Sequence, residues 1–205
     1  MVNAIIFDFG DVFINKNKEA KDKALTDLGL KEWTEELENL EARLETGKIN
    51  DEGFLKELHK HMPNATLKEI KAAWNAGIED FPLYRLEFLQ NLSESYRLFL
   101  LSNTDPIHIQ KFERDVEASF YTDFYLCFEK VYFSHEIGVR KPDAGAFNYV
   151  INKHDIQPKR TLVVDDKTFN TDAAAAMGFQ VWNLKKGEED VVELFEKKVI
   201  SLDEV

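Results

Sequence analysis

Short apolar segments recur along this chain and alternate with amphipathic ones. Four of them are continuously apolar and rich in β-branched or aromatic residues, which is the pattern of buried parallel strands. They are Val2 to Phe9, Arg97 to Leu101, Thr161 to Val164 and Gln180 to Leu184, and Lys130 to Ser134 is a shorter fifth. Helical patterns separate these segments, so we expect an α/β protein with a doubly wound, Rossmann-like parallel sheet.

The interval between the first and second apolar segments carries helical patterns only. They predict four helices, within residues 18–30, 32–49, 51–63 and 66–78. Thr66 and Glu69 have the spacing of a capping box at the start of the fourth helix. Four helices are too many for one crossover between strands. We therefore expect an inserted helical subdomain over residues 16–81 and an α/β core formed by residues 1–15 and 82–205.

Polar residues follow the apolar segments at the points where strands should end. They are Asp8 after the first, Ser102 and Asn103 after the second, Lys141 after "YFSHEIG", and Asp165 and Asp166 after "TLVV". Ligands of open parallel sheets bind beyond the carboxyl ends of the strands, so these residues should meet at one edge. Each alone is typical of a turn or a helix cap. Together, carboxylates, a hydroxyl, an amide and an ammonium indicate phosphate and metal chemistry.

Composition narrows the classes of partner. The 205-residue chain has a formal net charge of −12, which disfavours nucleic acid and anionic membranes. Its single cysteine, Cys127, excludes an intrachain disulfide and fits a reducing compartment. The first residues lack the pattern of a signal peptide, and no apolar run reaches the ~20 residues of a membrane span. We expect a cytoplasmic protein, and no feature indicates an oligomeric state.

Four motifs carry a resemblance to a known family. They are "DFGDV" at the first strand, "LLSNTDP" at the second, "GVRKPD", and "VVDDKTFNTDAA" at the fourth. This set resembles the haloacid dehalogenase (HAD) superfamily of phosphohydrolases. The residues of the motifs are most similar to those of the branch that contains α-D-glucose-1-phosphate phosphatase. The resemblance covers the whole chain, and the helical insertion is similar to the smaller type of cap domain in that family.

The resemblance implies a nucleophile and a metal site. Asp8 would attack phosphorus and form an aspartyl-phosphate. Mg²⁺ would be the cofactor, since it prefers oxygen ligands. Its ligands would be Asp8, the carbonyl group of Gly10 and Asp166, with Asp165 and Asn170 orienting the acidic metal site.

The resemblance also implies a set of residues that bind the phosphate. Lys141 would neutralise the phosphate and keep Asp8 ionised. Ser102 and the backbone near Asn103 would hold phosphate oxygens. Arg43, in the helical insertion, could meet an anionic group of the substrate. Among the histidines, His108 lies nearest to the proposed site in the sequence.

The chain departs from the family pattern at Gly10. Most phosphatases of the superfamily carry there a second Asp, whose side chain acts as general acid and base, a contribution of roughly 10²–10⁴-fold. Three explanations stay open. Asp11 could supply the acid and base, the substrate could have a good leaving group, or the protein could bind without efficient turnover. We favour a good leaving group, such as that of a sugar 1-phosphate or an acyl phosphate, with a water or Asp11 assisting.

These observations predict a Mg²⁺-dependent phosphatase that hydrolyses a small phosphorylated metabolite, with a sugar phosphate favoured. One alternative is a weakly active or inactive phosphate- and metal-binding protein. Another is a haloacid dehalogenase, which would need no metal and would not require the Asp165–Asp166 pair.

Overall fold

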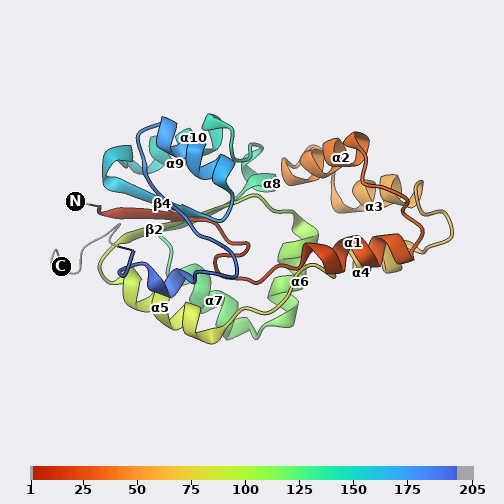
Figure 1. The fold of residues 1–205 in the computed structure, drawn as a ribbon, viewed down its shortest axis with the longest axis horizontal. Helices are drawn as coiled ribbons and strands as arrows, with labels where there is room; N and C mark the ends of the chain where they lie inside the picture. The colour runs from red at the N-terminus through yellow and green to blue at the C-terminus, as the bar shows by residue number, and fades with distance from the viewer. Residues whose placement is uncertain (1, 198–205) are drawn as a thin grey trace.

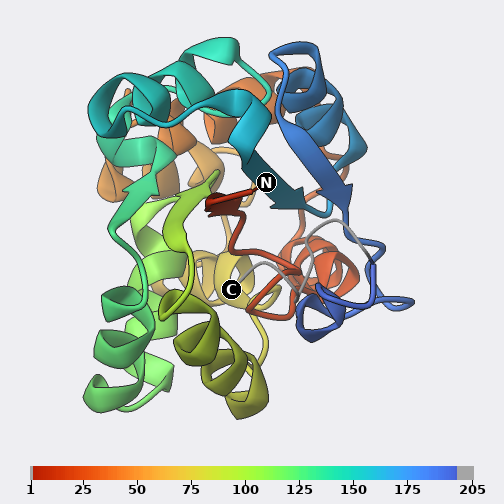
Figure 2. The same cartoon turned by 90° about the vertical axis from the view of Figure 1, so that its left-hand side faces the viewer.

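The computed structural model describes residues 2–197, and a five-stranded parallel sheet forms its centre. The strands are β1 Ala4–Phe7, β2 Arg97–Ser102, β3 Lys130–Phe133, β4 Thr161–Asp165 and β5 Gln180–Asn183. They pair in the order β3-β2-β1-β4-β5, with every pair parallel. Figure 2 views the sheet along the strands, with β1 in red between its neighbours. The predicted α/β fold with a Rossmann-like parallel sheet is confirmed.

Helices cover both faces of the sheet (Figure 1). On one face lie α5 Leu83–Ser93, α6 Pro106–Asp115 and α7 Ala118–Leu126, and on the other α9 Ala144–His154 and α10 Thr168–Ala176. The short α8 Ser134–Ile137 follows β3, and 3-10 turns cover Pro158–Arg160 and Val191–Glu193. Side chains alternate along β1: Ile5 and Phe7 join one hydrophobic cluster, and Ala4 and Ile6 join the other. The apolar run of β1 is therefore buried on both sides.

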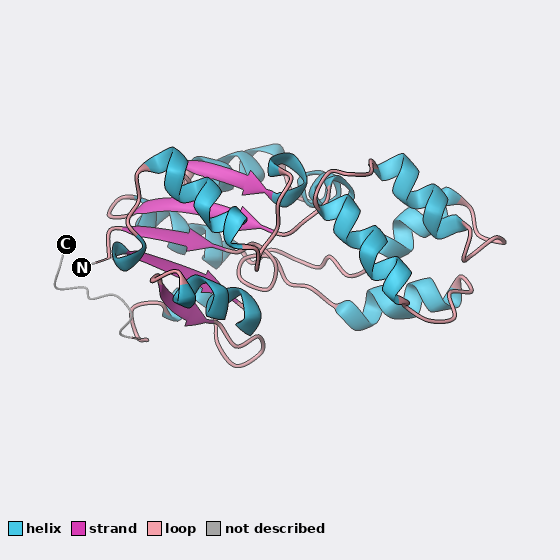
Figure 3. Cartoon of the chain, turned by 90° about the horizontal axis from the view of Figure 1, so that it is seen from above, coloured by secondary structure: helices cyan, strands magenta, loops and turns pink. Residues whose placement is uncertain are grey.

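Four helices stand apart from the sheet, and we call them the four-helix segment. They are α1 Lys18–Asp27, α2 Glu35–Glu45, α3 Asp51–His59 and α4 Leu67–Asn75. They enclose a hydrophobic cluster of their own, and the predicted capping box of Thr66 and Glu69 begins α4. Figure 3 shows the strands pointing towards this segment, which lies beyond their carboxyl ends. The division into a core of residues 1–15 and 82–205 and a cap of residues 16–81 stays a prediction, and residues 198–205 lie outside the described part.

A buried junction joins the four-helix segment to α6. The indole of Trp74 donates a hydrogen bond from Nε1 to Asp105 Oδ2 at 3.2 Å, and the His108 ring stacks on it with 5.3 Å between ring centroids. Asp105 also caps α6, because its Oδ1 accepts from the backbone nitrogens of Ile107 and His108 at 2.8 and 3.0 Å. The predicted helix start at Asp105, with Pro106 in the first turn, is confirmed.

The junction gives a prediction about acid stability. Burial alone would raise the pKa of Asp105, but the charge of His108 and several hydrogen bonds lower it from 3.8 to about 2. A depressed carboxyl pKa stabilises the fold above the unfolded pKa, and this stability is lost as the pH falls through the folded pKa. We expect Asp105→Asn to lose roughly 2 kcal/mol at pH 7, with the deficit shrinking between pH 4 and pH 2. Urea unfolding at several pH values measures it.

Asp115→Asn, at the exposed end of the same helix, is the matched control and should change stability by less than about 0.5 kcal/mol. An equal deficit for Asp105→Asn at pH 2 and pH 7 would contradict the electrostatic origin of the effect.

Cys127, next to the end of α7, packs partly buried against the larger hydrophobic cluster, and its thiol donates to the backbone oxygen of Asp123. Within residues 2–197, no helix combines the length and the apolar character needed to cross a bilayer.

Candidate active site

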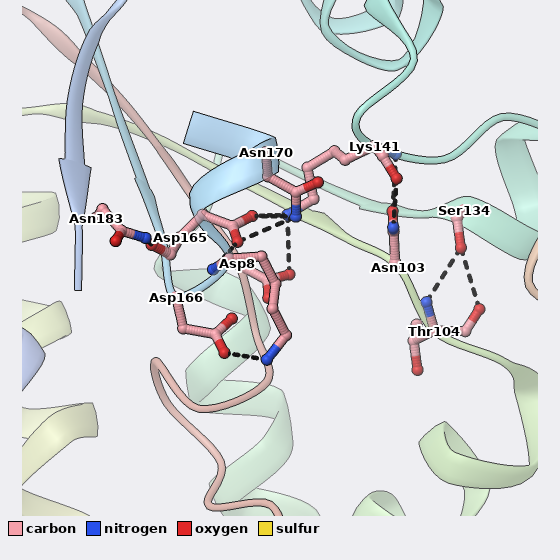
Figure 4. A network of polar contacts seen from close by, with 10 residues as sticks. Asp8, Asn103, Thr104, Ser134, Lys141, Asp165, Asp166, Asn170 and Asn183 are labelled. Atoms are coloured by element: carbon pink, nitrogen blue, oxygen red, sulfur yellow. Dashed lines mark hydrogen bonds and ion pairs between the residues drawn. The ribbon is translucent and has the colours of Figure 1, made fainter. Parts of the chain in front are cut away.

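The polar residues predicted at the strand ends meet at one edge of the sheet (Figure 4). Asp8 follows β1 directly, and its backbone nitrogen donates to Val164 of the adjacent β4 at 2.9 Å. Asp165 is the last residue of β4, and Asp166 follows it. The parallel pairing of β1 with β4 thus places three carboxylates together because both strands end at the same level. This confirms the reasoning from strand ends that the sequence supported.

Lys141 supplies the ammonium of the site. It comes from the loop before α9, is 2% exposed, and donates from Nζ to Asp8 Oδ1 at 3.0 Å and to Asp165 Oδ2 at 2.5 Å. The amide of Asn103 holds the main chain of Lys141: it donates to the Lys141 carbonyl oxygen at 2.7 Å and accepts from the Lys141 nitrogen at 2.9 Å. Asn103 therefore fixes the base of the lysine, a contact that the sequence did not suggest.

Asp165 is the most completely satisfied carboxylate of the group. It is fully buried, and both of its oxygens accept from Asn170 Nδ2 at 3.0 Å. The Lys167 backbone nitrogen donates to Oδ1 at 2.9 Å, and Lys141 donates to Oδ2. With every oxygen engaged, Asp165 is placed to orient Lys141 and the start of α10 rather than to coordinate a metal directly.

Asp8, Asp165 and Asp166 can each offer one oxygen such that all of these atoms lie within 4.8 Å of one another. An all-oxygen set of this kind suits a hard cation such as Mg²⁺. Asp166 is held by Lys167, whose Nζ donates to its Oδ2 at 2.5 Å, and the lysine side chain is 52% exposed. Because Lys167 is half-exposed, its ammonium can move away from Asp166 into solvent. The carboxylates of Asp8 and Asp166 then form an oxygen donor set that fits a divalent cation.

The electrostatics of the site favour an incoming cation. The pKa of Asp8 is raised from 3.8 to about 6, because burial and the charges of Asp165 and Asp166 together outweigh the opposing effect of Lys141. Burial also raises the pKa of Asp166. Burial alone would lower the pKa of Lys141, but the charges of Asp165 and Asp8 raise it above its ordinary value. Lys141 is thus held charged, and additional positive charge would ionise Asp8 fully.

The loop after Asp8 turns sharply at Asp11, which has a φ of 58°. Its carboxylate accepts from the backbone nitrogen of Lys16 at 2.9 Å and pairs with Lys186 Nζ at 3.0 Å. An Asp tolerates this left-handed conformation better than most residues. These contacts give Asp11 a part in shaping the loop.

A cleft of about 510 Å³ is lined by residues that follow the strand ends and by residues of the four-helix segment. From the core, Asn103, His108, Arg140 and Lys167 line it, and α2 contributes three glutamates that share one helix face, Glu38, Glu41 and Glu45. The Arg140 guanidinium pairs with Glu45 across the cleft at 2.5 Å. The volume is that of a pocket for a small metabolite.

The structure brings most of the predicted residues together and leaves one apart. Asp8, Gly10, Asp11, Asn103, Lys141, Asp165 and Asp166 lie around the strand ends, and Ser102, at the end of β2, is 2% exposed. Arg43 is instead exposed and lines a separate depression with Glu36, Asn39 and Glu57. It lies on a different face of α2 from the glutamates of the cleft, so the structure does not bring it to the strand-end residues.

Sequence reasoning missed two lysines of the site. Lys167 directly follows the "VVDD" motif, and this adjacency was the available signal. Lys16 lies beside Gly10 although the two are six positions apart, and no local pattern indicates their contact.

Comparisons with known proteins agree with this architecture. The chain is 29% identical over 198 residues to the D-ribitol-5-phosphate phosphatase of Bacteroides thetaiotaomicron, covering 92% of this chain and 95% of that one. A HAD family enzyme from the same organism, solved in complex with magnesium and inorganic phosphate, matches with a TM-score of 0.79 and 28% identity over 92% of this chain and 97% of that one. A HAD-like family hydrolase from Porphyromonas gingivalis matches with a TM-score of 0.86 and 27% identity, covering 98% and 99%.

A family model matches most of the chain as well. It describes a haloacid dehalogenase-like hydrolase and spans residues 2–178, from β1 to the end of the α10 turn. The matched range includes every residue of the strand-end cluster described above. The chain belongs to the haloacid dehalogenase-like hydrolase family.

Proposed function

We propose that this protein is a Mg²⁺-dependent phosphatase that hydrolyses a small phosphorylated metabolite, a polyol or sugar phosphate, through an aspartyl-phosphate on Asp8. The observation that carries the proposal is the position of Asp8: it follows a buried strand, lies 3.0 Å from the ammonium of Lys141, and has Asp166 near enough to share one cation with it. The similarity to a D-ribitol-5-phosphate phosphatase supports the substrate class.

Each residue of the site has its own role in the proposed reaction. Asp8 attacks phosphorus, and Lys141 neutralises the charge that gathers on the phosphoryl oxygens. Asp8, Asp166 and the carbonyl group of Gly10 would hold Mg²⁺, and Asp165 and Asn170 orient the site. When bound, Mg²⁺ would offset the repulsion between the phosphate and the carboxylate.

The cleft suits a ligand rich in hydroxyl groups. It is lined by both signs of charge, and several of these groups are paired with each other, as in Lys21 with Glu41 and Arg140 with Glu45. Paired charges leave donors and acceptors side by side without a large net field, which matches hydroxyl groups better than a second anion. The helices that line it would act as the cap of the active site.

A phosphate-release assay tests the proposal. The purified chain is given p-nitrophenyl phosphate and a panel of polyol, sugar and acyl phosphates, with Mg²⁺ or with EDTA. We expect Mg²⁺-dependent release that is fastest on polyol or sugar phosphates. No release on any substrate, together with thermal stabilisation by Mg²⁺ and beryllofluoride, would instead favour a binding protein without turnover. Halide release from 2-haloacids without metal would favour a dehalogenase.

The contacts of Asp11 predict that it is not the general acid and base. In Asp11→Asn, the amide oxygen can still accept from Lys16, and Asn tolerates the φ of 58°. We expect turnover within about threefold of the wild type, whereas the loss of a general acid–base would lower it by roughly 10²–10⁴-fold. Steady-state kinetics of the variant on a polyol phosphate distinguishes these two outcomes. Asp11→Ala, which loses the acceptor, should lower stability by about 1 kcal/mol.

A further inference from the structure

The side chain of Lys16 passes close to the Cα atom of Gly10. The backbone of Gly10 does not have a positive φ, so its conformation alone does not require glycine. A Cβ atom placed there would lie 2.7 Å from Lys16 Cδ and 3.5 Å from Lys16 Nζ. The Lys16 side chain therefore passes directly over Gly10, two positions after Asp8, and a side chain at Gly10 would displace it.

Lys16 also differs from the other cations of the cleft in its partners. Lys18, Lys21, Arg140, Lys167 and Lys186 each have a carboxylate within 4.0 Å. Within the part of the chain that the structure describes, the ammonium of Lys16 has neither an ion pair nor a hydrogen bond. A half-buried ammonium with no carboxylate within ion-pair distance is available to a ligand, although its charge also acts on Glu45 at longer range.

The main chain of Lys16 is fixed on both sides. Its nitrogen donates to Asp11 Oδ1 at 2.9 Å, its carbonyl oxygen accepts from Lys186 Nζ, and the residue forms an antiparallel bridge with Ile78. These contacts come from three separate segments, so the backbone has little freedom to carry the side chain away. The side chain therefore starts from a fixed point, and it lines the cleft with its ammonium near Gly10.

We propose that Lys16 is a catalytic residue that stabilises the departing oxygen of the substrate, and this inference rests on the proposed phosphatase function. Lys141 is almost fully buried and Asp8 is partly exposed, so a phosphate ester reaches Asp8 from the open side, where Lys16 lines the cleft beside Gly10. As the bond from Asp8 to phosphorus forms, the bond from phosphorus to the departing oxygen breaks and its electron pair stays on that oxygen. The oxygen accepts a hydrogen bond from Lys16 Nζ and takes its proton from water.

The test compares substrates whose leaving groups need different amounts of help. In Lys16→Met, kcat/KM should fall about 10²-fold on the best alkyl phosphate of the panel, because one donor to the developing charge is lost. On p-nitrophenyl phosphate it should fall less than about fivefold, because the nitrophenolate is already stable as an anion. Lys16→Arg, which keeps the positive charge, should restore much of the activity on the alkyl phosphate.

Two further variants distinguish a catalytic effect of Lys16 from an effect on folding. Gly10→Ala keeps the lysine and the backbone carbonyl group but forces Cδ away, and it should show the same dependence on the leaving group. Lys23→Met removes an exposed lysine of α1 and should leave both activities unchanged. Equal losses on the two substrates, or no loss in Lys16→Met, would overturn the proposal while wild-type turnover still supports the phosphatase function. No wild-type turnover on either substrate would instead overturn the proposed function itself.

Discussion

Asp8→Asn is expected to lower turnover by more than about 10³-fold on every phosphate ester, because the variant has no carboxylate to attack phosphorus. An amide also cannot contribute an anionic oxygen to a divalent cation, so the metal site loses one of its ligands. Phosphate release by the purified variant, measured at saturating Mg²⁺, gives the magnitude. Retention of more than a tenth of the wild-type rate would remove Asp8 as the nucleophile.

The same variant should fold well, which separates a chemical effect from a structural one. Because the pKa of Asp8 is raised to about 6, ionising this carboxylate opposes folding. In EDTA, wild-type stability should therefore decline as the pH rises from 4 through 6, and Asp8→Asn should lack this decline. At pH 7 we expect the variant to be as stable as the wild type or more stable, by up to about 2 kcal/mol, in urea unfolding.

Lys141→Met should have the largest effect on stability. The ammonium is 2% exposed and binds Asp8 and Asp165, so its removal leaves two buried carboxylates without their counter-charge. Breaking a buried ion pair from one side costs about 3–5 kcal/mol. We expect a loss of that size in the free energy of unfolding at pH 7, together with a loss of more than about 10²-fold in turnover.

A double variant and a surface control sharpen this prediction. Adding Asp165→Asn to Lys141→Met neutralises the fully buried carboxylate and should recover more than half of the lost stability. Lys167→Met removes the half-exposed partner of Asp166 and should change stability by less than about 1 kcal/mol. If Lys141→Met unfolds no more easily than Lys167→Met, the central ion pair contributes little and the account of the site's electrostatics is wrong.

Much of the fold follows from patterns that are local in the sequence. Strands such as β1 and β4 are buried on both faces, so they read as apolar runs, and their polar ends mark the edge where the site forms. The same strand-end pattern predicts that Asp8, Asp165 and Asp166 are neighbours, as they are in the structure. The observed strand limits differ from the predicted ones by one or two residues, because strand pairing ends where the chain turns towards the next helix. Ser134, for example, begins α8 instead of ending β3.

Contacts that cross between loops were not accessible in this way. The choice of which α2 face lines the cleft depends on how the four-helix segment sits on the sheet, so Arg43 and Glu45 could not be told apart by periodicity alone. The role of Asn103 depends on the approach of the Lys141 backbone, 38 residues further along the chain. In the sequence, Gly10 stands where most relatives of the family carry a carboxylate. The structure adds that the Lys16 side chain lies where a side chain at this position would begin.

The central claim is that phosphate passes through Asp8, and trapping the intermediate tests it most directly. The wild-type protein is mixed with its best substrate and Mg²⁺, quenched in acid within the first turnovers, and digested for peptide mass spectrometry. We predict a phosphorylated peptide that contains Asp8, that disappears in Asp8→Asn, and that decays at a rate compatible with kcat. Rapid phosphate release with no phosphorylated Asp8 at any time point, or phosphorylation at another residue, would contradict the account.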